Sequence, residues 1–261
     1  MAEAARRIDV LDTAPRFTAG EVEALNARCA GVATQEMLGA VLREGLAGRI
    51  AAVSSFGAES AVLLHLIASI DPTVPVLFLE TGKHFPETLA YRDAITARLG
   101  LTNLISLTPD PLALAARDGT GLRWSYDPDG CCEIRKVRPL AKALAGFDAS
   151  FTGRKGFQSA TRAGLARFEI DATDALGRLK VNPLADWSSD QIASYFAATG
   201  LPAHPLVAQG YPSIGCSPCT SMVAPGEDAR AGRWKGWDKT ECGIHVDGAA
   251  EALPPGYEPF L

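Results

Sequence analysis

Residues 49–80 read RIAAVSSFGAESAVLLHLIASIDPTVPVLFLE, and this stretch decides the fold. A short apolar run (49–56) enters a turn of small residues, and an apolar segment long enough for a buried helix (59–70) follows. A second short apolar run (74–80) comes next. The stretch therefore predicts a strand, a buried helix and a second strand.

The alternation continues along the rest of the chain. Two helices are expected within 20–47, with Thr34 as a candidate cap of the second, and further helices at 86–100 and 188–200. Further strands are expected at 103–109, 148–153 and 178–184. Such alternation predicts an α/β fold with a mainly parallel sheet and helices on both faces. Residues 201–261 are rich in Gly and Pro, so we expect a loop-rich lid held by something other than a core.

The composition fits an intracellular enzyme. Apolar residues make up 47% and aromatic residues 7%, enough for a sizeable core. No stretch is apolar enough to span a membrane, and the N-terminus lacks a secretory signal. We therefore expect a cytoplasmic location, where six cysteines favour metal binding or catalysis over disulfides. The net charge of −5 argues against nucleic-acid binding.

Two cysteine pairs carry most of the chemical information: Cys131-Cys132, and Cys216 with Cys219 in GCSPC. Adjacent cysteines rarely bond each other. Four thiolates suit an iron–sulfur cluster or a structural zinc, and the adjacent pair is unusual for zinc. Four unrelated thiols remain an alternative, because the pairs must converge in space.

A fifth thiol, Cys242, lies in ECGIH near Lys239 and His245. Cations lower the pKa of a thiol, so a reactive cysteine is predicted here. The alternative is a buried, inert cysteine. Cys29, by contrast, lies in an amphipathic helix and is expected in the core.

Several segments have the composition of anion-binding loops. The turn SSFGAES (54–60) opens a helix, where backbone N–H groups can approach an anion, although it has no Walker lysine. The strand end LETG (79–82) would lie beside it at the carboxyl edge of the sheet. The loop 152–165 carries Arg154, Lys155 and Arg162, and guanidinium groups bind phosphate or sulfate oxygens. The alternatives are an ordinary turn and solvated loops.

Taken together, the chain resembles the assimilatory adenylyl-sulfate reductases, the iron–sulfur branch of the phosphoadenylyl-sulfate reductase family. The resemblance runs from about residue 50 to 245 and rests on SSFGAES, LETGKHFPETL, CCEIRKVRPL, TGRKGFQSATRAG, KVNPLADWS, GYPSIGCSPCT, GEDARAGRW and KTECGIH. It implies an ATP-pyrophosphatase-like fold, also called adenine nucleotide alpha hydrolase-like. Helices (1–48) would pack on a nucleotide-binding domain (49–200), and a cluster-tethered lid (201–261) would carry the nucleophile.

The resemblance also implies the site residues. A 4Fe-4S cluster would be held by Cys131, Cys132, Cys216 and Cys219. The implied catalytic residues are Cys242 as the nucleophile, Lys136 between the cluster and the substrate, and His245. Substrate contacts fall to Ser54, Ser55, Gly57, Ser60, Glu80, Thr81, Gly82, Arg154, Arg230 and Arg233. The family motif usually reads LDTG, so Glu80 is a departure.

The implied activity is reduction of adenylyl sulfate to sulfite and AMP through an S-sulfocysteine, in sulfate assimilation and cysteine biosynthesis. Thioredoxin or glutaredoxin would be the reductant, and a homo-oligomer is possible. One alternative is reduction of the 3′-phosphorylated substrate, or dual specificity. Others are an ATP pyrophosphatase that adenylates a substrate, and a non-catalytic iron–sulfur sensor.

Overall fold

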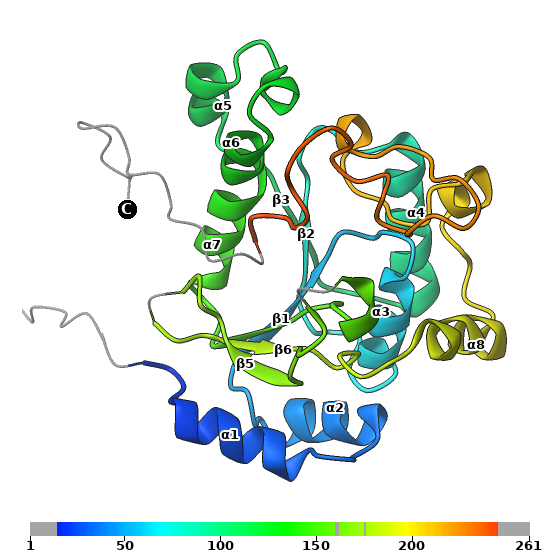
Figure 1. Cartoon of the computed structure of the whole chain (residues 1–261). Coiled ribbons are helices and arrows are strands. Elements are labelled where there is room, and N and C mark those ends of the chain that lie inside the picture. The colour runs from blue at the N-terminus through cyan, green and yellow to red at the C-terminus, as the bar shows by residue number, and fades with distance from the viewer. Residues whose placement is uncertain (1–14, 160–161, 175, 245–261) are drawn as a thin grey trace, which may run out of the picture.

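The computed structural model describes residues 15–159, 162–174 and 176–244. The strands in these residues form a six-stranded sheet in the order β3-β2-β1-β4-β6-β5 (Figure 1). Their bounds are β1 Ile50–Ser54, β2 Val76–Leu79, β3 Leu104–Leu107, β4 Ala149–Phe151, β5 Phe168–Ile170 and β6 Leu179–Val181. All but β5 were expected from the sequence, and these are mutually parallel. The unexpected β5 pairs antiparallel with β6.

The expected helices are present, and the segment before β4 adds further ones. The α-helical bounds are α1 Ala19–Arg28, α2 Thr34–Arg43, α3 Ser60–Ala68, α4 Pro86–Leu99, α5 Pro111–Arg117, α6 Pro128–Cys132, α7 Arg138–Leu144 and α8 Ser189–Thr199. The expected cap at Thr34 is wrong, because Ala33 is the cap residue and makes no side-chain bond. The Thr34 hydroxyl instead accepts a 2.8 Å bond from the indole N–H of Trp187.

Alternate residues of the central strands face opposite sides of the sheet. Ala52 and Phe78 belong to the larger core, which includes residues of α1, α2, α3, α4 and α8. Ala51 and Leu77 face the other side, where α7 covers them. The predicted arrangement of helices on both faces is therefore confirmed (Figure 1). Cys29 lies in the larger core, as expected.

One helical stretch carries the first cysteine pair. It consists of α6, a π-helical segment η2 (Glu133–Val137) and α7 in direct succession. π-helical turns inside α-helices are frequent at functional sites. Arg135 of this turn donates to the carbonyl of Thr81 at 2.6 Å and to Asp118 at 2.6 Å. These bonds fix the stretch against the carboxyl end of β2.

The C-terminal segment is held by loop contacts, as its composition suggests. Thr220 forms an antiparallel bridge with Arg233. The amide of Ser217 donates to the carbonyl of Lys83 at 2.8 Å, which joins the second cysteine pair to the loop after β2. Among the described residues, no helix combines the length and apolar character needed to cross a membrane.

Candidate active site

A cavity of about 230 Å³ lies at the carboxyl ends of β1, β2 and β4. Ligands of open α/β sheets bind at this edge, where the chain leaves the strands. The predicted site residues that line the cavity are Ser54, Ser55, Gly57, Ser60, Lys136, Arg154, Cys216, Arg230, Arg233 and Cys242. Segments far apart in the sequence therefore meet at one place.

The SSFGAES loop forms one wall with an unusual backbone. Phe56 has φ 48°, a left-handed conformation that non-glycine residues rarely adopt. Its ring is buried edge-to-face against Phe78, with centroids 5.6 Å apart. The Ser60 hydroxyl donates to the carbonyl of Gly57 at 2.8 Å, which tightens the turn into α3. The strained residue is anchored by packing, so the loop keeps its shape before a ligand binds.

The predicted residues of the second strand end lie outside the cavity lining. Glu80 accepts a 3.0 Å bond from the amide of Gly82 and lies 3.7 Å from Arg92. Thr81 is buried, and its hydroxyl lies 3.4 Å from the sulfur of Cys216. The expected substrate contacts of Glu80, Thr81 and Gly82 stay predictions.

The two cysteine pairs converge. Cys131, Cys132 and Cys216 are buried, and Cys219 is half-buried. Burial raises the pKa of Cys131 to about 11, Arg135 opposes this, and Cys216 and Cys219 raise the pKa further, so the thiols interact. Among the described residues, no group of three or more His, Cys, Asp or Glu side chains is arranged to hold a single metal ion.

Cys242 is half-buried, lines the cavity and lies beside Cys132 of the first cysteine pair. A hydrogen bond with Cys132 lowers the pKa of Cys242; burial opposes this, while Lys136, the amide of Ile244 and Arg233 reinforce the lowering. Burial alone would lower the pKa of Lys136, but the charges of Cys242, Cys216 and Cys132 outweigh it and raise that pKa. A thiolate and an ammonium group thus stabilise each other.

Arg233 lies beside these groups without a carboxylate partner among the residues described. Its guanidinium lies over the ring of Trp234, 4.4 Å from the centroid. The Nε of Arg233 and the Nε1 of Trp234 are both buried and have no hydrogen-bond partner in the described structure. Both side chains line the cavity, so two N–H donors there can donate hydrogen bonds to a ligand anion.

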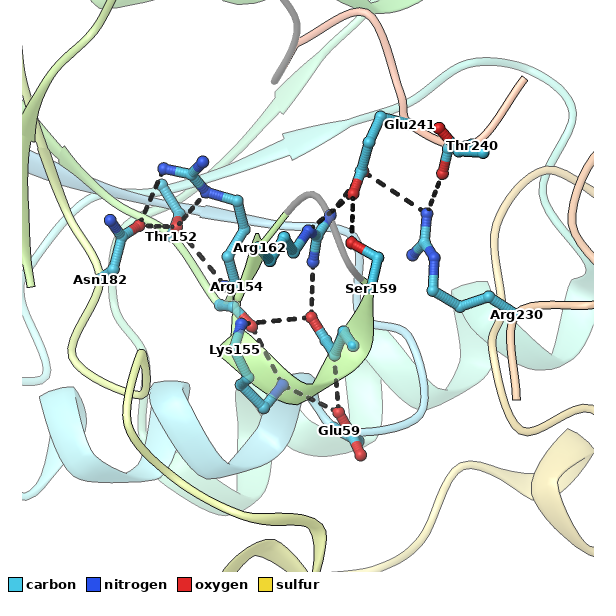
Figure 2. Close-up of polar contacts among 12 residues, drawn as sticks. Glu59, Thr152, Arg154, Lys155, Ser159, Arg162, Asn182, Arg230, Thr240 and Glu241 are labelled. Carbon is cyan, nitrogen blue, oxygen red and sulfur yellow. Dashed lines mark hydrogen bonds and ion pairs between the residues drawn. The ribbon is translucent and has the colours of Figure 1, made fainter. Parts of the chain in front are cut away.

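The basic loop after β4 also lines the cavity, and its cations Lys155 and Arg162 are paired with carboxylates (Figure 2). Arg154 lies 2.8 Å from Glu169, and Lys155 lies 2.9 Å from Glu59. Arg162 binds Glu241, the residue before Cys242, at 2.6 Å. Lys155 and Arg162 were expected in the basic loop but not among the site residues, and Glu59 and Glu241 had no predicted role in the site. The signal for Glu241 was a carboxylate beside the predicted nucleophile in a chain segment rich in arginine.

His245, the third predicted catalytic residue, lies outside the described residues.

Comparisons with known proteins identify the family of the chain. The phosphoadenosine phosphosulfate reductase domain matches residues 49–222. The chain belongs to this family. An adenosine 5'-phosphosulfate reductase of Mesorhizobium japonicum is 51% identical, and the match covers 95% of this chain and 96% of that protein. A phosphoadenosine 5'-phosphosulfate reductase of Gloeobacter violaceus is 42% identical over 76% of this chain and 83% of its own length.

Solved structures support the fold. The phosphoadenylyl-sulfate reductase of Candida auris, in a phosphate complex, has a TM-score of 0.65 and 26% identity, covering 79% of this chain and 98% of its own. An FMN adenylyltransferase of Candida glabrata has a TM-score of 0.51 at 16% identity, covering 78% of this chain and 68% of its own. The second likeness concerns the fold alone, which is the expected ATP-pyrophosphatase-like architecture.

Proposed function

We propose that this family member is an adenylyl-sulfate reductase, which converts adenylyl sulfate to sulfite and AMP. The observation that carries the proposal is the place of Cys242. Its thiol lines the same cavity as the SSFGAES loop and the arginines Arg230 and Arg233. A nucleophile, a turn suited to an anion and cationic side chains thus face one space.

In the proposed first step, the Cys242 thiolate attacks the sulfur atom of the sulfate group. A sulfur–sulfur bond forms, the bridging sulfur–oxygen bond breaks, and its electron pair leaves on the phosphate oxygen of AMP. Charge grows on those oxygens, and Arg233, Arg230 and the loop amides would stabilise it. Lys136 keeps the attacking sulfur deprotonated and close to its target.

In the proposed second step, a thiolate of an external dithiol protein attacks the sulfur of Cys242. Sulfite leaves with the electron pair of the sulfur–sulfur bond, and a mixed disulfide remains. The second thiol of the reductant resolves it, so the reductant ends as a disulfide and Cys242 as a thiol. Thioredoxin or glutaredoxin fits this chemistry, and a reducing cytoplasm would supply it.

The cysteine pairs fit a 4Fe-4S cluster by their donor chemistry. Cys131 interacts with Cys216 and Cys219 of the other segment, and the cations of Lys136 and Arg233 lie within electrostatic reach of both Cys132 and Cys216. When bound, such a group would add its charge beside the active site and tie the C-terminal segment to α6, which carries Cys131 and Cys132. The sulfur of Cys132 would then hold no proton, so Lys136, Arg233 and the Ile244 amide would hold the Cys242 thiolate.

Reduction of the 3′-phosphorylated substrate is the second candidate. The Gloeobacter violaceus relative carries that name at 42% identity. The two substrates differ by one phosphate group on the ribose, so an assay separates them directly.

The test is sulfite release by anaerobically purified protein with thioredoxin and each substrate in turn. We expect turnover of adenylyl sulfate, about four irons per chain, and no turnover in a Cys242→Ser variant that retains its iron. Activity with the 3′-phosphorylated substrate alone would assign the second candidate. Full activity of Cys242→Ser would overturn the mechanism, and stoichiometric zinc without iron would overturn the cluster.

A further inference from the structure

The residue before the nucleophile is a buried carboxylate in the cavity wall. Glu241 is only 8% exposed and lines the cavity together with Cys242. Figure 2 shows its carboxylate between side chains of the basic loop and Arg230. An ionised group buried to this extent requires charged partners to offset its desolvation.

The two arginines hold Glu241 unequally. Arg162 donates two charge-assisted bonds to the carboxylate, at 2.8 and 2.6 Å. A third bond of 3.2 Å comes from the hydroxyl of Ser159. Arg230 approaches only to 3.5 Å and donates a shorter bond of 2.6 Å to the carbonyl of Thr240. Paired short bonds from one guanidinium are the strong arrangement, so Arg162 is the firm partner and Arg230 the loose one.

Other contacts hold the residues around Cys242 against the α6–α7 stretch. Lys239 forms an ion pair with Asp129 of α6. Ile244 packs against the core beneath α7. A Cβ atom on Gly243 would lie 3.2 Å from the side chain of Val137, so the backbone runs close to η2. These contacts join the tail to the α6–α7 stretch, whereas Glu241 joins it to the basic loop across the cavity.

We infer that Glu241 is a positioning residue. Its bonds with Arg162 hold the Cys242 thiol in place, and its contact with Arg230 is replaced by a contact between Arg230 and the bound substrate. The inference rests on the proposed function. Arg162 would hold the carboxylate throughout, and Arg230 would pass from Glu241 to an oxygen of the phosphosulfate. The carboxylate therefore occupies part of the anion site until an anion enters.

The test compares Glu241→Gln with wild-type protein in three measurements. Isothermal titration with AMP measures the anion site, and we expect about 3–10-fold tighter binding because Arg230 is released. The single-turnover rate of S-sulfocysteine formation reports how well the Cys242 thiol is positioned for attack. We expect this rate to be about 10–100-fold lower in the variant. Iodoacetamide labelling of Cys242 without ligand should become several-fold faster, because the tail is held less firmly.

Two further variants separate charge from geometry. Glu227→Gln removes a carboxylate from an exposed part of the same segment and should change none of the three measurements. Arg162→Lys keeps a cation but loses the paired donors, so it should slow S-sulfocysteine formation as Glu241→Gln does. Iron content should stay unchanged in every variant.

Opposite changes of AMP affinity and reaction rate distinguish this role from a structural one. If Glu241→Gln leaves all three measurements at wild-type values, the inference is wrong. If it weakens AMP binding, slows the reaction and loses iron together, Glu241 only stabilises the fold. A wild-type protein that forms no S-sulfocysteine would overturn the proposed function, while AMP binding and labelling would still test the seating of Cys242.

Discussion

The guanidinium of Arg233 lies over the ring of Trp234, 4.4 Å from its centroid, with its Nε buried and unbonded in the described structure. The stack holds a cation at the cavity wall, and no carboxylate among the described residues neutralises it. We predict that Arg233→Ala weakens substrate or transition-state binding by roughly 1.5–3 kcal/mol, the cost of one charge-assisted contact. Steady-state kinetics with adenylyl sulfate measures this, and unchanged catalytic efficiency would contradict the assignment.

The variant Trp234→Phe complements Arg233→Ala, because it tests the indole N–H separately from the aromatic stacking. It keeps an aromatic face under the guanidinium but removes the indole N–H, which also lacks a partner in the part of the chain that the structure describes. We predict a smaller loss, about 0.5–1.5 kcal/mol, if the indole donates to the substrate. Wild-type kinetics in this variant would restrict the role of Trp234 to stacking.

The approach of Gly57 to Ile214 joins the SSFGAES loop to the second cysteine pair. A Cβ atom on Gly57 would lie 3.2 Å from the Ile214 carbonyl, closer than most Cβ contacts. We predict that Gly57→Ala weakens AMP binding and also loosens the segment around Cys216. The AMP affinity, measured by titration, and the iron content should both fall relative to the wild-type protein. A change in AMP affinity alone would mean that the two segments move independently.

Lys136 offers a test of function without touching a sulfur ligand. We predict that Lys136→Met lowers kcat by about 100-fold, because a buried cation beside the reacting sulfur is lost. Iron per chain should stay at the wild-type value. Turnover and iron analysis on the same preparation check both parts, and loss of iron would show Lys136 to be structural.

The central part of the fold was predictable because its strands and helices carry strong local patterns. The apolar runs around Ala52 and Phe78 predicted buried strands, and the structure buries both faces of them. The strand β5 was not expected, since it has three residues with a charged one, Glu169, at its centre. Its pairing with β6 depends on tertiary contacts that no local pattern encodes.

The residues of the candidate site were also predictable from the sequence only in part. The sequence motifs predicted site roles for Ser54, Arg233 and Cys242, because each lies in a recognisable segment. In the structure all three line one cavity. The partners of the basic residues could not be read from the sequence. Glu241 and Arg162 are far apart along the chain, and only folding brings them within 2.6 Å.

A buried histidine away from the site predicts how stability depends on pH. His204 is 1% exposed, accepts a 3.2 Å bond from the amide of Leu206, and lies 3.1 Å from the hydroxyl of Thr88. Burial lowers its pKa from 6.5 to about 4, with Glu87 opposing the change. The unfolded chain therefore binds a proton at a higher pH than the folded protein does.

The free energy of unfolding should fall as the pH drops from about 6.5 towards 4, by on the order of 2–3 kcal/mol from His204. Well above pH 6.5 both states are neutral at this residue, so its contribution is then independent of pH. His204→Asn keeps an acceptor for the Leu206 amide and removes the titrating group. Urea unfolding at pH 7, 6 and 5 should show a weaker pH dependence in this variant, with a lower starting stability because the Thr88 contact is lost. Equal slopes in the two proteins would mean that His204 is not protonated on unfolding in this range.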